Sequence, residues 1–122
     1  MEKDNFYKRL KDKMDDYAHL VYSLTRKFPK EEVLGITSQL RRATLSVVLN
    51  YIERYARSTK DKVYKNFIEI SYGSLQESKY LLSFSFVENY LSEESYNKVL
   101  KLADETGAML WGIRKNIGKE CK

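Results

Sequence analysis

The chain has 122 residues and a formal net charge of +5, with 43% apolar and 32% charged residues. These values predict one globular domain, spanning 1–122, whose positive charge attracts polyanions more strongly if several copies assemble. The only cysteine, Cys121, excludes an internal disulfide, and no apolar run is long enough for a signal peptide or a membrane span, so we expect a cytoplasmic protein with no membrane partner.

The first predicted helix covers residues 4–27. Its apolar side chains recur at steps of three, four or seven residues, the spacing of one helix face. They are Phe6, Leu10, Tyr17, Val21, Leu24 and Phe28. Pro29 is expected to end this helix, because proline lacks an amide donor and restricts the residue before it.

The second predicted helix, residues 36–57, has a wider apolar arc than an internal core requires. One row consists of Leu40, Ala43, Val47 and Tyr51, and a second of Leu45, Val48, Leu49 and Ile52. A polar row also follows this helix and consists of Gln39, Arg42, Ser46, Asn50, Glu53 and Arg57. This polar row faces either solvent or, alternatively, the lumen of an oligomer or a ligand-binding groove, and its periodicity does not distinguish these possibilities.

The third predicted helix, residues 59–88, carries two apolar rows that together cover about two-thirds of its circumference. The first row is Val63, Phe67, Ile70, Leu81 and Phe84. The surface helix of a monomer needs a narrower apolar arc, so the second row is predicted to contribute to a subunit interface. The interface residues expected in this second row are Tyr64, Ile68, Tyr72, Leu75 and Leu82.

Two polar residues, Ser74 and Glu77, interrupt the first of these rows. A buried carboxylate without a partner is costly, so Glu77 either lies in water at the edge of the row or belongs to a hydrogen-bonded polar layer between helices. We expect Glu77 to be at least partly buried, with hydrogen bonds from a neighbouring helix.

The fourth predicted helix covers residues 93–116, with Ser92 as its N-cap and Gly118 as its C-cap. Its expected core face is Tyr96, Leu100, Ala103, Gly107, Leu110 and Ile117. No segment has the pattern of a strand, and the connections between the four helices are short. The sequence therefore predicts an all-α, antiparallel up-down-up-down four-helix bundle that assembles with copies of itself.

Basic and aromatic residues are concentrated where the second helix meets the third. The cations are Arg54, Arg57, Lys60, Lys62 and Lys65, and Tyr55 and Tyr64 lie among them. Cations bind phosphates and aromatic rings stack on bases, so this corner is a candidate nucleic-acid site, with Tyr55 the preferred stacking residue, or else a solubilising patch. A second cluster, Arg114, Lys115, Lys119 and Lys122, either adds to such a site or complements a helix dipole.

No arrangement typical of catalysis is found. The single histidine, His19, and Cys121 have no partner in the sequence for nucleophile-and-base chemistry. There is no phosphate-binding glycine loop and no Glu-x-x-His pair of the kind that binds metals in bundles. We therefore expect a protein that is not an enzyme and has no metal or cofactor.

Several ordered motifs resemble a known family. They are 28–32 (FPKEE), 34–43 (LGITSQLRRA), Ser46 with Asn50, 73–77 (GSLQE) and 90–94 (YLSEE). Over residues 6–117 the chain is similar to the four-helix-bundle family encoded by intervening sequences in bacterial 23S rRNA genes. The family usually has Ile-Ala-Glu-Gly after the asparagine, where this chain has Tyr51-Ile52-Glu53-Arg54, which makes the corner more basic.

This resemblance implies a barrel- or ring-like homopentamer and, by family analogy, Asn50 as the donor to Glu77 in a polar layer with Ser74. The family also resembles the accessory variability determinant of diversity-generating retroelements, a basic pentamer that binds nucleic acid and a reverse transcriptase. Two functions are therefore expected: an oligomer that binds RNA or single-stranded DNA, or an assembly module for a protein such as a reverse transcriptase.

Overall fold

The structure, a computed structural model, describes residues 2–57 and 62–120, with side chains within 5–57, at 63 and within 65–116. This part of the chain is all α-helical, as predicted, and contains no strand. The elements are α1 (Glu2–Thr25), a 3-10 helix η1 (Lys30–Glu32), α2 (Ile36–Ala56), α3 (Lys62–Val87) and α4 (Glu93–Glu120). Gly118 therefore lies inside α4 rather than at its cap. Residues 58–61, where the third helix was predicted to begin, lie outside the described residues.

The helix ends follow from local chemistry. Helix α1 stops at Thr25, and η1 begins directly after Pro29. At the end of α3, Asn89 has a φ of 67°, the left-handed conformation that asparagine tolerates. The predicted N-cap of α4 is confirmed, because the Ser95 amide donates a 3.1 Å hydrogen bond to the Ser92 hydroxyl.

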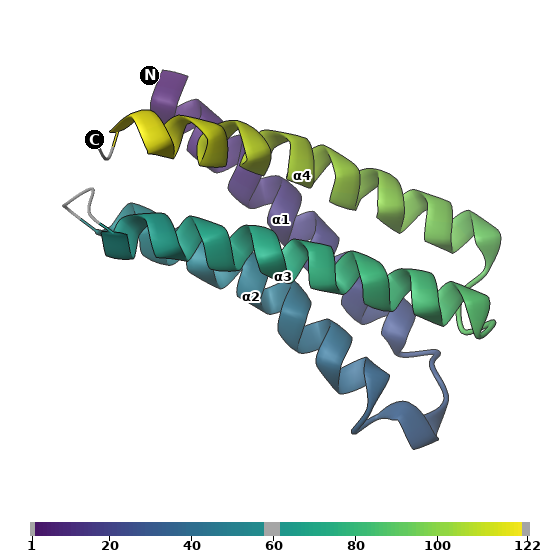
Figure 1. Ribbon diagram of the computed structural model, residues 1–122. Coiled ribbons are helices and arrows are strands. Elements are labelled where there is room, and N and C mark those ends of the chain that lie inside the picture. The colour runs from purple at the N-terminus through teal and green to yellow at the C-terminus, as the bar shows by residue number, and fades with distance from the viewer. Residues whose placement is uncertain (1, 58–61, 121–122) are drawn as a thin grey trace.

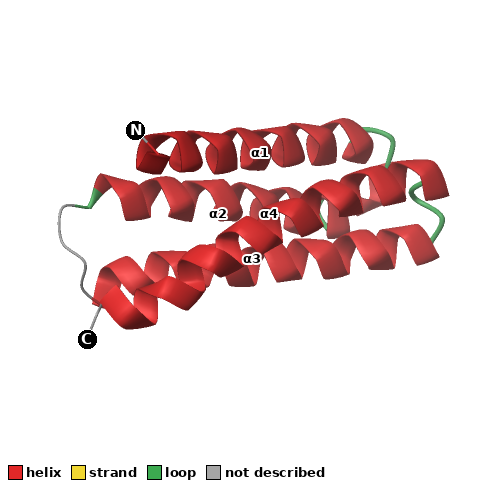
Figure 2. Cartoon of the chain, turned by 90° about the horizontal axis from the view of Figure 1, so that it is seen from above, coloured by secondary structure: helices red, strands yellow, loops and turns green. Residues whose placement is uncertain are grey.

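The four helices lie lengthwise around one core (Figure 1). Each helix packs against two neighbours, so that the order around the core is α1, α2, α3, α4 and back to α1. Figures 1 and 2 place the start of α1, the end of α2, the start of α3 and the end of α4 at the same end of the molecule. No described helix combines the length and the apolar character needed to cross a bilayer.

The apolar periodicity of α1, α2 and α4 largely locates the core. Its fully or nearly fully buried side chains include Leu10, Tyr17 and Val21 from α1, Leu40, Val47 and Tyr51 from α2, and Val99, Ala103 and Leu110 from α4. On α4 the buried residue at the start of the row is Val99, whereas the sequence pattern pointed to the neighbouring Leu100, which is half-buried.

Helix α3 corrects the sequence prediction, because the row expected at a subunit interface is the one that fills the core. Ile68, Leu75 and Leu82 have no exposed surface at all and can contribute nothing to another subunit. Tyr72 is half-buried against Trp111 of α4, with ring centroids 5.7 Å apart. The side chain of Tyr64 lies outside the described residues.

Small serine residues explain why this row faces inward. Ser71, Ser78 and Ser85 alternate with the buried aliphatic residues of α3 and are themselves fully buried. Each hydroxyl donates to a carbonyl, and Ser71 does so across helices, to the carbonyl of Val47 on α2 at 2.7 Å. Short side chains with satisfied hydroxyls let helices approach closely, so these serines belong to the core rather than to a polar face.

The other apolar row of α3 is left on the outside. Val63, Ile70 and Phe84, spaced by seven residues or a multiple of seven, remain exposed, and Tyr80 and Val87 lie exposed on the same helix. We call these five residues the outer row. On α2, Leu45 and Leu49 are likewise exposed, together with most of the polar row predicted there. The apolar surplus inferred from the sequence therefore exists, but on a different set of side chains.

Candidate nucleic-acid interface

Positive charge is concentrated in three segments of the chain that together make up about half of its residues. Residues 1–13, 47–74 and 107–122, which we call the basic half, contain fourteen of the 22 Lys and Arg residues but only seven of the 17 Asp and Glu residues. The remaining residues carry eight cations against ten carboxylates. The helix ends gathered at one end of the molecule in Figure 1 belong to the basic half, so the whole net positive charge arises there.

Five cations of the basic half are exposed and make no ion pair with another described residue. They are Lys8, Arg9, Arg57, Lys65 and Lys115. Others are partly neutralised, since Lys11 lies 2.9 Å from Asp15 and Lys13 lies 3.6 Å from Glu105. Exposed, unpaired cations keep their full attraction for phosphate groups, whereas paired ones must first give up a carboxylate partner.

The predicted corner between α2 and α3 is only partly available on the surface. Arg57 and Lys65 are exposed, and the Arg57 guanidinium lies 5.0 Å from the ring centre of Phe67. Lys60 lies outside the described residues, and for Lys62 only the backbone, at the start of α3, is described. The structure thus supports Arg57 and Lys65 as solvent-facing cations.

Arg54 corrects the prediction for this corner, because its side chain is only 6% exposed. It follows Val47 by seven residues and Tyr51 by three, so the helix turns it towards the same inner side as these core residues. Its guanidinium lies 4.7 Å from the ring centre of Tyr55. Arg54 therefore belongs to the packing of this end of the bundle and is not a surface contact for phosphates.

Tyr55 lies in an aromatic cluster that limits its use for base stacking. The side chain is 41% exposed, but its ring centre lies 4.1 Å from that of Tyr7 and 5.2 Å from that of Tyr51. The Arg54 guanidinium also lies against the ring, so neighbouring side chains already cover part of its surface. Burial and the nearby Tyr55 raise the pKa of Tyr51, so the Tyr51 hydroxyl is uncharged near neutral pH.

An exposed tryptophan on α4 is the aromatic feature that sequence reasoning did not identify. Trp111 is 48% exposed, and the Arg114 guanidinium lies 5.0 Å from both its ring centre and that of Tyr72. Arg114 also donates from Nε to both carboxylate oxygens of Glu69, at 2.9 and 3.1 Å. This fixes Trp111 at the surface one turn before the exposed Lys115, a pairing that helical spacing alone could have indicated.

The expected polar layer exists in a smaller form and without Glu77. Asn50 donates from Nδ2 to the Ser46 carbonyl at 2.9 Å and to the Ser46 hydroxyl at 3.0 Å, and that hydroxyl lies 2.8 Å from the hydroxyl of Ser74. This chain of hydrogen bonds links α2 to α3. Glu77 is exposed instead, because it follows Ile70 by seven residues and precedes Phe84 by seven, which places it on the outer side of α3.

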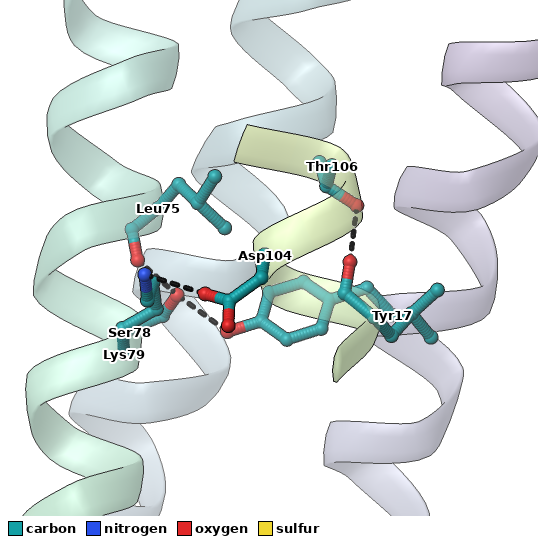
Figure 3. Close-up of polar contacts among 7 residues, drawn as sticks. Tyr17, Leu75, Ser78, Lys79, Asp104 and Thr106 are labelled. Atoms are coloured by element: carbon teal, nitrogen blue, oxygen red, sulfur yellow. Dashed lines mark hydrogen bonds and ion pairs between the residues drawn. The ribbon is translucent and has the colours of Figure 1, made fainter. Parts of the chain in front are cut away.

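A buried polar contact crosses the middle of the core (Figure 3). The Tyr17 hydroxyl of α1 lies 2.7 Å from the Ser78 hydroxyl of α3, which donates to the Leu75 carbonyl at 2.8 Å. Burial raises the pKa of Tyr17 to about 12, although the Ser78 hydrogen bond partly lowers it. Lys79 and Asp104 form an ion pair of 2.7 Å at the same level between α3 and α4. These groups link α1, α3 and α4 to one another.

The described residues contain no group of three or more His, Cys, Asp or Glu side chains placed to hold a metal ion. The arrangement in the basic half is one of surface cations, an exposed tryptophan and a fixed helical frame. Such an arrangement offers electrostatic binding to a polyanion and a flat contact for a base.

This geometry first defines a class, that of all-α four-helix proteins with a basic end. Residues 9–112 match the family of 23S rRNA-intervening sequence proteins, so the chain belongs to that family, as its motifs predicted. The fold is similar to the crystal structure of a protein with unknown function from the S23 ribosomal protein family of Bacteroides thetaiotaomicron. The TM-score is 0.81 with 21% identity, over 90% of this chain and 98% of that one, which shows the shared fold. Among curated proteins, none matches the chain.

Proposed function

We propose that this chain is a non-enzymatic, antiparallel four-helix bundle that binds RNA or single-stranded DNA through its basic half and acts as a ring- or barrel-like homo-oligomer, a pentamer as the family resemblance implies. The observation that carries the proposal is the charge distribution. One half of the chain has twice as many cations as carboxylates, while the other half has a small negative excess. A polyanion therefore meets an attractive field at one end of the bundle.

Assembly would strengthen this attraction. In a ring in which all copies point the same way, every basic half lies on the same side, and one nucleic-acid strand contacts several copies at once. Each further contact is then intramolecular and gains from a high effective concentration, so the overall affinity exceeds that of one copy. Trp111 and Lys115 add an exposed ring beside a cation, a combination suited to single strands.

The test is a charge reversal in the basic half, Arg57→Glu with Lys65→Glu, because both side chains are exposed and form no ion pair with a described residue. The matched control is Lys98→Glu with Lys101→Glu, two exposed lysines of α4 outside the basic half. Titration of labelled RNA and single-stranded DNA at several salt concentrations should show weaker binding only for the first variant. Its slope of log K against log salt should fall by about 0.7–0.9 for each phosphate group that the variant no longer binds.

Two results would contradict the proposal. If the parent binds neither nucleic acid at low salt, the function is wrong. If both double variants weaken binding equally, the attraction comes from net charge alone and the basic half is not the site. Light scattering on each variant shows whether assembly is intact before the affinities are compared.

We also propose the outer row of α3 as the surface through which copies assemble. A row of exposed apolar side chains at heptad spacing is typical of a helix that packs against another helix. Ile70→Glu should therefore shift the protein to smaller species, while Gln76→Glu, at an exposed polar position of the same helix, should not. Light scattering measures both, and a parent that stays monomeric at micromolar concentration refutes the oligomer.

A second candidate function is an assembly module whose partner is another protein, such as a reverse transcriptase. The observation that favours it is the same outer row together with the exposed Leu45 and Leu49 of α2, which offer apolar surface beyond one helix contact. Salt distinguishes the two functions, because binding through an apolar surface changes little between low and moderate salt, whereas binding to phosphates weakens steeply.

A further inference from the structure

At the opposite end of the bundle from the basic half, the start of α2 borders an open hollow of about 380 Å³. Its lining residues are Tyr22, Val33, Thr37, Ser38, Arg41, Arg42 and Leu45. Two guanidinium groups, three hydroxyl-bearing side chains and the first turn of a long helix thus line one small space. This set of groups is unusual in a half of the chain that carries no net positive charge.

Thr37 supplies the observation that points to a ligand. Its side chain is 4% exposed, and its hydroxyl has no hydrogen-bond partner among the described residues. The buried hydroxyls of Thr25, Thr44 and Thr106 each donate to the carbonyl four residues earlier, at 2.7–2.8 Å. For Thr37 that carbonyl belongs to Val33, before α2 begins, so the helix does not supply the partner.

A buried hydroxyl without a partner is rare in folded proteins and needs an explanation. Rotation about the Cα–Cβ bond moves the Thr37 hydroxyl to another staggered position. An acceptor in the hollow would therefore allow the hydroxyl to turn and donate to it. The hollow itself is thus the natural place for the missing partner.

The two arginines differ in a way that suits anion binding. Arg41 is held in place, because its Nε donates to the Thr25 hydroxyl at 2.8 Å and its Nη2 to the Tyr22 carbonyl at 3.4 Å. The guanidinium also lies 4.6 Å from the ring centre of Tyr22, and its Nη1 donates to no acceptor among the described residues. Arg42 is exposed and makes no hydrogen bond or ion pair with a described residue.

The helix start adds further donors, and one of them is already used. The carboxylate of Glu32 accepts a 3.2 Å hydrogen bond from the Ile36 amide. The next two amides, of Thr37 and Ser38, have no carbonyl one turn earlier within the helix. A helix N-terminus also favours negative charge, so an anion in the hollow gains from both amides and dipole.

We propose that this hollow binds a phosphomonoester group, held by Arg42 and the Nη1 of Arg41 and accepting hydrogen bonds from Thr37 and Ser38. Several donors converging from different directions match the three terminal oxygens of such a group. The group comes either from a free mononucleotide or from the 5′ end of a strand, since both present the same chemistry. The site is separate from the basic half, and its failure leaves the charge-reversal test there unaffected.

The test uses the full chain with uridine 5′-monophosphate and, as the matched probe, uridine. The variants are Thr37→Val, which keeps the shape and removes the hydroxyl, and Arg42→Gln, with Lys101→Gln as a control that also removes one exposed cation. Calorimetry should show binding of the monophosphate but not of uridine. Affinity should fall about tenfold or more in the first two variants and stay unchanged in the control.

Thermal unfolding shows whether Thr37→Val is folded, and its affinity for the monophosphate then separates a binding site from a merely unsatisfied hydroxyl. If Thr37 is only unsatisfied, the valine variant is as stable as the parent or more stable and binds the monophosphate equally well, which overturns the proposal. Absence of any monophosphate binding by the parent at millimolar concentration overturns it too. Expected instead is a variant that keeps its stability and loses affinity.

A second pair of probes, tetrauridine with and without a 5′-phosphate, identifies the source of the group. If the phosphorylated strand binds more tightly than the monophosphate, the proposal holds with a strand end as the ligand. If the two bind equally, it holds with a free compound. If the affinity is the same with and without the phosphate in both pairs of probes, the hollow is not a phosphomonoester site.

Discussion

The buried contact between Tyr17 and Ser78 makes the alkaline stability of this protein predictable. Ser78 has one hydroxyl hydrogen, which it donates to the Leu75 carbonyl at 2.8 Å. The Tyr17 hydroxyl must therefore be the donor in its 2.7 Å contact with Ser78. Burial disfavours the charged phenolate and raises the pKa of Tyr17 to about 12, although the contact with Ser78 partly lowers it.

The direction of the pH effect follows from this raised pKa. In the unfolded chain tyrosine ionises near pH 10, so between about pH 10 and pH 12 the folded chain holds the proton that the unfolded chain has lost. The stabilisation is fully present below pH 10 and is lost as the pH rises through 12. A difference of about two pKa units corresponds to about 2–3 kcal/mol of unfolding free energy.

Tyr17→Phe is the perturbation that isolates this effect. At pH 8 it should cost about 1 kcal/mol, the net value of one hydrogen bond, because Ser78 keeps its bond to Leu75. Between pH 10 and pH 12 the unfolding free energy of the variant should fall by about 2–3 kcal/mol less than that of the parent. The variant still loses some stability at alkaline pH, since burial also raises the pKa of Tyr51.

Urea unfolding followed by circular dichroism at pH 8, 10, 11 and 12 measures these differences. Tyr80→Phe is the control, because Tyr80 is 67% exposed and belongs to no buried hydrogen bond among the described residues. If the stability of Tyr17→Phe falls as much at alkaline pH as that of the parent, the pKa of Tyr17 is not raised in the folded chain.

Two further predictions concern the helix contacts. Ser71→Val should destabilise the protein by about 1–3 kcal/mol, because it forces a larger side chain between α2 and α3 and removes the bond to the Val47 carbonyl; urea midpoints no lower than the parent's would contradict the close packing described. Glu77→Gln and Glu77→Ala should both change stability by less than about 0.5 kcal/mol, because the side chain is exposed, and a clear loss of stability in the alanine variant alone would restore the polar layer predicted from the sequence.

The helices themselves were predictable because local signals agree with the global pattern. Pro29 and Ser92 mark a helix end and a helix start, and the apolar spacing of α1 and α2 identifies side chains that are buried in the fold. Such signals act within one turn or on one face. They do not depend on what the helix packs against, so they can be recognised from the sequence alone.

The inward face of α3 was not predictable by the same reasoning. Both apolar rows have suitable spacing, and counting hydrophobic residues favours neither. The deciding factor is tertiary: Ser71, Ser78 and Ser85 satisfy their hydroxyls on carbonyls and leave room for neighbouring helices. A serine counted as polar in a sequence pattern becomes a small core residue once its single hydrogen bond is made.

The candidate interface was predicted in part for a related reason. Charge counting pointed to the corner between α2 and α3, where Arg57 and Lys65 are exposed in the structure. It misassigned Arg54, whose burial depends on the register of α2 and on the ring of Tyr55, and it passed over Trp111, whose exposure depends on the contact between α3 and α4. The exposure of a single side chain depends on how the helices pack. A sequence pattern predicts that exposure only when one face of the helix is clearly apolar and the other polar.

The exchange of the two rows on α3 changes which residues favour self-assembly. The surplus of apolar surface still has to be covered, and it now rests on Val63, Ile70 and Phe84, with Glu77 between the last two. A carboxylate in the middle of an apolar row is costly to bury unless the neighbouring copy supplies a cation or a hydrogen-bond donor. Glu77 would then fix the register of one copy on the next, because any slip along the row would leave it unpaired. A residue that contributes little to the stability of one chain would in this way decide how the chains fit together.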